Sequence, residues 1–170
     1  MDVDRYIRVN FSTFQQGIEA IGGVDITLTQ AEANYLNGLN SQLSLTAGTH
    51  RLRGWVALQY ARCRKIDSDW MRIQRQRTVI QAAFNKTRSL SVGELNNLLN
   101  SVLPLVRTNL TEGEILSLMS LAPKFQGVTI QQMTIPASGT YGSMRGMGGR
   151  SLYAVDFAAN AKILQSFLYG

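Results

Sequence analysis

The sequence predicts an α/β fold, a sandwich of helices and strands. Two observations lead to this prediction. Segments with the apolar spacing of helices follow one another along the chain, and most begin at a helix-capping residue. Between them lie short apolar or alternating segments that are typical of strands, and strands separated by helices indicate layered packing. The length of 170 residues fits a single domain spanning residues 1–170, with a hydrophobic core.

Capping residues predict where the helices start. In a capping box, a Ser or Thr is followed three residues later by Glu or Gln, and both side chains satisfy free backbone amides at the helix start. Four such pairs occur in chain order: Ser12 with Gln15, Thr29 with Glu32, Ser91 with Glu94, and Thr111 with Glu114. Ser68 is expected to cap a long helix that runs to about Thr87, and Asp156 to cap the last helix.

The first half of the chain contains one predicted strand. Gly22 and Gly23 end the first helix, and residues 24–28 then alternate in polarity, which predicts a strand. Residues 37–51 are polar and glycine-containing, so they predict a loop. A short helix is expected after Gly54.

The end of the chain predicts two further strands. Residues 128–135 are predicted as a strand that Pro136 stops, and residues 152–155 as a short apolar strand. The glycine-rich residues 139–149 between them resemble a phosphate loop only superficially. They predict a flexible surface loop, because the required strand, loop and helix spacing is missing.

The composition is that of a globular protein with a basic surface. Hydrophobic residues make up 45% and charged residues 16%, which excludes a disordered chain. The net charge of +6 favours anionic partners such as phosphates, nucleic acid, teichoic-type polymers or an acidic membrane face. The single cysteine excludes an intramolecular disulfide. The chain as given is expected to be soluble, because it has no signal peptide and no apolar run near the roughly 20 residues that cross a bilayer.

An arginine-rich segment carries the main functional signal, with six Arg and Lys residues in eighteen positions. Asp69, Arg72 and Gln76 are spaced i, i+3 and i+7, so they share one face of the predicted helix. That face starts at the helix N-terminus, where the backbone dipole and free amides favour an anion. Arg62 and Arg64 lie in the turn just before it and could converge on the same point.

This pattern suits a diphosphate ligand. Guanidinium groups bind phosphate oxygens in a bidentate manner and stay charged, and a Gln amide can donate to another oxygen. Asp69 repels such a ligand, so it fits only if it orients an arginine or accepts a proton from an attacking hydroxyl. The alternative is a solvated helix face with ordinary ion pairs, and the residues alone leave both open.

Several blocks of the chain resemble the LytR-CpsA-Psr family. The most specific block runs Ala57-Leu58-Gln59-Tyr60-Ala61-Arg62-Cys63-Arg64 and continues with Asp69, Arg72 and Arg75-Gln76-Arg77. Other blocks are Val9-Asn10-Phe11 with Phe14, Ile21-Gly22-Gly23-Val24-Asp25-Ile26, the spacing Gly48, Leu52, Gly54, and later Ile135-Pro136, Tyr141, and Asp156 with Asn160. The blocks occur in the family's order and cover nearly the whole chain.

The resemblance implies a cell-envelope transferase. Family members are membrane-anchored at the outer face of the cytoplasmic membrane. They transfer anionic glycopolymers, such as wall teichoic acid or capsule, from a polyprenyl-pyrophosphate carrier to peptidoglycan. The implied fold is an α/β/α sandwich around a central mixed sheet, with the lipid tail in an apolar pocket and Mg²⁺ bridging the pyrophosphate. The implied partners are the lipid-linked glycopolymer, the peptidoglycan acceptor and, through an anchor outside this sequence, the membrane.

Site residues follow from the motif positions. Those expected at the pyrophosphate are Arg62, Arg64, Arg72 and Gln76. Asp69 and Arg64 are the expected catalytic residues, whereas Arg75 lies off the shared face and is expected to be structural or at the rim. The N-terminal part of the family domain, where the resemblance places the magnesium-binding aspartates, is absent from this sequence, so no metal ligand is assigned. A sheet without those neighbours would expose an edge that can pair with a second copy.

Two other functions stay open, and a few residues have ordinary structural explanations. The chain could be an inactive polyprenyl-phosphate-binding module, or a nucleic-acid-binding regulator, an older view of the family. A nucleic-acid partner is not expected, because no helix-turn-helix or interleaved aromatic stripe occurs.

His50 is expected in a surface loop and Cys63 as a small packed residue. Seven apolar residues fit a core and a lipid pocket equally: Leu95, Leu98, Leu99, Val102, Ile115, Leu118 and Met119.

Overall fold

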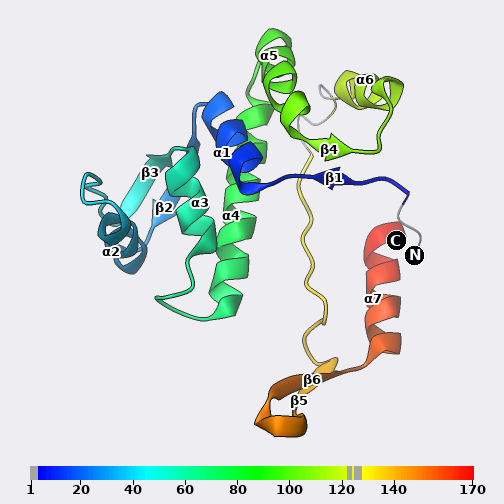
Figure 1. Cartoon of the computed structure of the whole chain (residues 1–170). Helices are drawn as coiled ribbons and strands as arrows, with labels where there is room; N and C mark the ends of the chain where they lie inside the picture. Colours follow the sequence, from blue (N-terminus) through cyan, green and yellow to red (C-terminus); the bar gives the residue numbers. More distant parts are fainter. Residues whose placement is uncertain (1–3, 122–123, 125–127) are drawn as a thin grey trace. The chain divides into compact units, whose positions relative to one another are not determined.

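The computed structural model describes residues 4–121, 124 and 128–170 (Figure 1). The chain divides into two compact units, Met1–Val128 and Thr129–Gly170. Helices and strands are mixed along the chain, so the predicted α/β class is confirmed.

The core of the first unit surrounds one strand pair. Six elements build it: α1 (Phe11–Ala20), β2 (Val24–Leu28), α2 (Gln30–Leu39), β3 (Gly48–Leu52), α3 (Gly54–Arg62) and α4 (Asp69–Arg88). β2 and β3 pair antiparallel, with Val24 opposite Leu52. Val24, Ile26 and Leu28 are buried while the residues between them are exposed, the alternation of a sheet with one packed face. Helix residues such as Ala33 of α2 complete this core.

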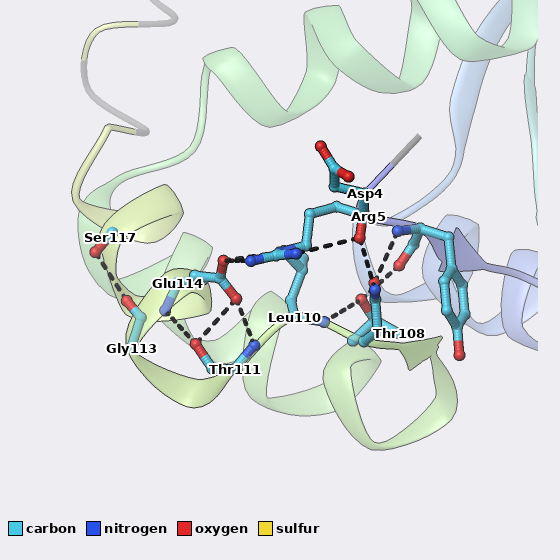
Figure 2. Close-up of polar contacts among 10 residues, drawn as sticks. Asp4, Arg5, Thr108, Leu110, Thr111, Gly113, Glu114 and Ser117 are labelled. Atoms are coloured by element: carbon cyan, nitrogen blue, oxygen red, sulfur yellow. Dashed lines mark hydrogen bonds and ion pairs between the residues drawn. The ribbon is translucent and has the colours of Figure 1, made fainter. Parts of the chain in front are cut away.

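A second strand pair in this unit joins segments that are distant in the sequence. The elements involved are β1 (Ile7–Arg8), α5 (Val92–Val102), η1 (Leu103–Leu105), β4 (Arg107–Thr108) and α6 (Glu112–Ser120). β1 pairs antiparallel with β4. Beside the pair, an Arg5 nitrogen lies 2.7 Å from a Glu114 carboxylate oxygen, and the Tyr6 amide donates to the Asn109 side chain at 2.9 Å. Figure 2 shows the contact of Arg5 with Glu114, which holds the segment before β1 against the start of α6.

The second unit is a hairpin followed by a helix. It contains β5 (Tyr141–Arg145), η3 (Met147–Gly149), β6 (Ser151–Val155) and α7 (Phe157–Tyr169), with β5 and β6 antiparallel. The buried side chain of Asn160 organises it. Its Oδ1 accepts from the Ala137 amide at 2.8 Å, and its Nδ2 donates to the Thr140 hydroxyl and the Asp156 carbonyl, both at 2.7 Å. Asn160 therefore fastens α7 to the segment before the hairpin.

Most of the predicted helix starts are confirmed. The side-chain and backbone contacts of the capping box form at Thr29 with Glu32, Ser91 with Glu94, and Thr111 with Glu114. Ser68 and Asp156 also cap helices as expected. The prediction at Ser12 is wrong, because Asn10 accepts from the Thr13 amide and starts α1 two residues earlier.

The predicted strands are confirmed only in part. Residues 24–28 and 152–155 lie in strands, but 128–135 form none. A segment with strand-forming residues becomes a strand only when a neighbour fills its backbone hydrogen bonds. Two strands, β3 and β5, lie in segments predicted as loops. Within the described residues every strand pair is antiparallel and two-stranded, so the expected central mixed sheet is not formed there.

Candidate functional site

Three side chains of the arginine-rich segment meet at the start of α4. The Ser68 hydroxyl accepts from the Met71 amide at 3.4 Å, which starts the helix and places Asp69 in its first turn. Arg64 donates to Oδ1 of Asp69 from Nη2 at 2.7 Å. Arg72 lies 2.8 Å from the same oxygen through Nη1 and donates to Oδ2 from Nη2 at 3.0 Å. We call Arg64, Asp69 and Arg72 the arginine cluster.

The arginine cluster presents cationic donors to solvent around one shared carboxylate. The side chains of Arg64 and Asp69 are 64% and 55% exposed, whereas that of Arg72 is only 23% exposed. Nε of Arg72 is buried and has no hydrogen-bond partner in the part of the chain that the structure describes. The carboxylate of Asp69 thus orients two guanidinium groups, one of the two explanations that the sequence allowed for an acidic residue here.

The other two predicted site residues do not join the arginine cluster. Arg62, the last residue of α3, places its guanidinium 4.6 Å from the centre of the Phe11 ring, a cation–π contact with α1. Gln76 is exposed on α4, four residues after Arg72. The sequence therefore predicted residues of one region, of which the structure brings three into direct contact.

Arg75 has a different environment, buried beneath the turn between α3 and α4. Its side chain is 3% exposed. Its Nε donates to Glu32 of α2 at 2.7 Å, and its Nη1 donates to Asp67 at 3.0 Å and to the Cys63 carbonyl at 3.2 Å. Its Nη2 donates to the second oxygen of Asp67. Arg75 is thus a structural residue, as its position off the shared helix face predicted.

Burial shapes the ionisation of this region. Burial alone lowers the pKa of Arg75, but hydrogen bonds to Asp67 and Glu32 outweigh it and raise the pKa overall. Burial also raises the pKa of the Tyr60 phenol to about 12, and the negative charge of Glu32 acts in the same direction. Sequence reasoning missed the role of Glu32 because its capping box already explained that residue. It missed Asp67 because only the folded turn brings this residue to Arg75.

An apolar pocket of about 360 Å³ lies between α1, α4 and α5. Its lining is Val9, Thr13, Phe14, Gly17, Ile18, Ile21, Val79, Ile80, Ala83, Thr87, Leu98, Leu99 and Val102. Three of the residues that fitted both a core and a lipid pocket, Leu98, Leu99 and Val102, therefore line an open space. A Cβ atom added at Gly17 meets no heavy atom within 4 Å, so this wall has room for a side chain.

The described residues do not fit a magnesium site. Within residues 4–121, 124 and 128–170, no three His, Cys, Asp or Glu side chains are grouped as metal ligands. Both carboxylate oxygens of Asp69 are engaged by arginines. The expectation of Mg²⁺ therefore stays a prediction.

His50 and Cys63 both have neighbours within the first unit. His50 lies in β3 rather than in a loop, with its Nε2 2.9 Å from the Thr46 carbonyl. Cys63 is buried and packed, as expected. In the described part of the chain, no helix combines the length and apolar character that a bilayer span requires.

Comparison with known proteins decides the family. A model of the LytR_cpsA_psr family matches residues 1–166. This chain belongs to the LytR-CpsA-Psr family. The LytR-CpsA-Psr chain is 42% identical over 107 residues to the polyisoprenyl-teichoic acid–peptidoglycan teichoic acid transferase TagU of Oceanobacillus iheyensis, covering 59% of this chain and 32% of TagU. It is 29% identical over 135 residues to TagT of Bacillus subtilis, which carries the same transferase name, covering 78% of this chain and 42% of TagT. The matched part of each relative is thus less than half of its length.

Solved structures share the fold of this LytR-CpsA-Psr chain. The structure described as TagT bound to LIIa-WTA superimposes with a TM-score of 0.69 at 24% identity, covering 98% of this chain and 62% of TagT. Bacillus subtilis TagV gives a TM-score of 0.69 at 24% identity, covering 99% of this chain and 63% of TagV. The α/β architecture is therefore that of the LytR-CpsA-Psr domain.

Proposed function

We propose that this LytR-CpsA-Psr chain serves the transfer of an anionic glycopolymer from a polyprenyl-pyrophosphate carrier to peptidoglycan, at the outer face of the cytoplasmic membrane. The observation that carries the proposal is the arginine cluster, in which one carboxylate holds two guanidinium groups at the start of a helix. The transferase names of the TagU and TagT relatives support the same chemistry.

The arginine cluster would hold the pyrophosphate of the carrier. Arg64 and Arg72 carry further N–H groups besides those that bond Asp69, and these would donate to the phosphate oxygens. Gln76 lies one helical turn after Arg72 and would donate to a further oxygen. Arg62 would join them by turning from the Phe11 ring. These cations would stabilise the charge that develops on the phosphoryl oxygens during transfer.

The reaction is a phosphoryl-group substitution. A hydroxyl of the peptidoglycan acceptor attacks the phosphorus that carries the sugar, and a new phosphorus–oxygen bond forms. The bond from that phosphorus to the polyprenyl phosphate breaks, and polyprenyl phosphate leaves. Asp69 would accept the proton of the attacking hydroxyl while it continues to orient an arginine.

The pocket between α1, α4 and α5 would hold the lipid tail. Its lining is almost entirely apolar, and its volume of about 360 Å³ lies within the usual range of small-molecule sites. Pocket and arginine cluster share helix α4, because Val79, Ile80 and Ala83 line the pocket while Arg72 lies earlier on the same helix.

The experiment separates the two halves of the proposed site. A polyprenyl-pyrophosphate analogue is titrated into the wild-type chain and into Arg72→Ala and Gly17→Phe, with and without magnesium, and turnover is followed with a peptidoglycan acceptor. We expect Arg72→Ala to weaken binding of the diphosphate, and Gly17→Phe to weaken binding only of long-tailed analogues. Arg51→Ala, at an exposed position of β3, is the matched control. Equal binding and turnover in all four proteins would refute the site.

A second candidate is a binding module that holds the lipid carrier without transferring it. The arginine cluster and the pocket both lie among the described residues, whereas no grouped set of metal ligands occurs among them, and this combination favours a binding module. Analogue binding that does not depend on magnesium, together with no turnover, would identify this function. Turnover that Arg72→Ala abolishes would identify the transferase.

A further inference from the structure

The turn between α3 and α4 is held from below by one buried side chain. Arg75 donates to the carbonyl of Cys63, where the turn begins, and to both carboxylate oxygens of Asp67, near its end. Cys63 lies between Arg62 and Arg64, and Asp67 lies two residues before Asp69. Arg75 therefore contacts the turn on both sides of Arg64, the residue of the turn that donates to Asp69.

We infer that Arg75, acting through Asp67 and the Cys63 carbonyl, is a positioning residue that fixes the α3–α4 turn so that Arg64 meets Asp69 in the arginine cluster. The inference rests on the proposed function, because the cluster is the proposed pyrophosphate site. Arg75 itself touches no ligand in this scheme, since its side chain is 3% exposed.

The hydrophobic core fixes the position of Arg75. Its Nε donates to Oε1 of Glu32, while Oε2 of the same carboxylate accepts from the Thr29 amide at 2.9 Å in the capping box of α2. The helix that carries Glu32 is anchored by Ala33 and Leu36, which are fully buried. Because Arg75 bonds both α2 and the turn through buried, charge-assisted hydrogen bonds, it fixes the turn relative to α2.

The geometry requires a guanidinium group. Three separate directions are used, toward Glu32, toward Asp67 and toward the Cys63 carbonyl, and a planar fork with five donors satisfies them together. A lysine ammonium is a single point of charge. Arg75→Lys would keep the positive charge but release part of the turn.

The test removes the turn contact and keeps the buried pair. Asp67→Asn leaves Arg75 paired with Glu32, and Asp67 lies in the turn rather than in a helix, so the variant is expected to fold. Inorganic pyrophosphate is titrated calorimetrically into the full chain. We expect affinity to fall about tenfold, within the coupling range of residues in one hydrogen-bond network. Asp67→Glu, which keeps the carboxylate, should recover most of the affinity.

Double variants distinguish positioning from general damage. If Asp67 acts through Arg64, then Asp67→Asn should weaken binding little further in an Arg64→Ala background. Its effect should add in full to that of Gln76→Ala, on the helix beyond the turn. Arg75→Lys should behave as Asp67→Asn does, which gives a second route to the same measurement if the first variant folds poorly.

The outcomes separate this inference from the proposed function. A wild-type chain that binds pyrophosphate while Asp67→Asn and Arg75→Lys bind equally well overturns the inference alone. Full additivity of Asp67→Asn with Arg64→Ala also overturns it. A wild-type chain that binds no pyrophosphate overturns the proposed site and the inference with it.

Discussion

Arg64 donates two hydrogen bonds to a single oxygen of Asp69, from Nη2 at 2.7 Å and from Nε at 3.1 Å. The pair closes the turn between α3 and α4. Both side chains are more than half exposed, and solvent-exposed ion pairs contribute little to stability. The main effect of the contact is therefore to fix the position of the Arg64 guanidinium group, not to stabilise the fold.

Replacing this carboxylate should separate binding from turnover. In Asp69→Asn the repulsion of a phosphate disappears, while the amide oxygen of Asn can still accept from Arg64, so we expect inorganic pyrophosphate to bind about as tightly as in the wild type. Transfer should fall about 10²-fold or more, because the proton acceptor is lost. Calorimetry and an acceptor assay measure the two quantities. Asp25→Asn, another exposed and ion-paired aspartate, is the control. If Asp69→Asn transfers as fast as the wild type, Asp69 is not the proton acceptor.

Arg75 should dominate the stability of the first unit. Arg75→Ala leaves the buried carboxylate of Glu32 without its cation, and breaking a buried ion pair typically costs about 3–5 kcal/mol. Urea unfolding measures the change. Arg51→Ala breaks an exposed pair with Asp25 and should leave the free energy of unfolding nearly unchanged. Equal midpoints for the two variants would contradict the buried network.

Gly54, the first residue of α3, lies directly against the backbone of α1. A Cβ atom at this position would lie 2.3 Å from the carbonyl oxygen of Gln15, a backbone atom that cannot swing away. Gly54→Ala should therefore destabilise the fold by about 1–3 kcal/mol. At exposed Gly38 in α2 the added Cβ meets nothing within 4 Å, so Gly38→Ala should stabilise by about 0.5–1 kcal/mol. Thermal unfolding of both variants checks the opposite signs.

The contact of Arg5 with the carboxylate of Glu114, shown in Figure 2, should be sensitive to acid. The Thr111 amide first, and then Arg5, lower the pKa of Glu114 from its ordinary value of 4.5 to about 2. A lowered folded-state pKa gives stability that is present above 4.5 and lost as the pH falls toward 2. The gap in melting temperature between wild type and Glu114→Gln should thus exist at neutral pH and vanish near pH 2. A constant gap would disprove the assignment.

Tyr60 should limit stability at the alkaline end. Burial first, and then the charge of Glu32, raise its pKa from 10.0 to about 12. A raised folded-state pKa gives stability that is complete below pH 10 and is lost as the pH rises through 12. Phenolate absorbance should show a late-titrating group that Tyr60→Phe removes. Titration of every tyrosine at the ordinary value would contradict this.

Local chemistry made the helices predictable. A capping box depends on two side chains three residues apart, so the starts of α2, α5 and α6 follow from the sequence alone. Asn10 was missed because Ser12 offered a competing box two residues later. The strands β3 and β5 were missed because polar and glycine residues fill them, and only pairing with β2 and β6 makes them strands.

The candidate site was predictable to the extent that it follows helical spacing. The i, i+3 relation of Asp69 and Arg72 is a property of any helix. Arg64, which was expected to approach from the preceding turn, contacts Asp69 in the structure. The contact of Arg75 with Glu32 joins residues 43 positions apart, and no local pattern encodes it. Arg62 was assigned by motif position, and its contact with Phe11 depends on the packing of α3 against α1.

The pairing of Arg5 with Glu114, 109 positions apart, also constrains the order in which the parts of the first unit can fold. A polypeptide leaving the ribosome exposes Arg5 long before α6 has been synthesised. The β2–β3 core can assemble meanwhile from nearby segments, but the N-terminal strand must wait, since closing so long a loop carries an entropic cost. Final closure of the first unit is thus expected to be a late event in biosynthesis.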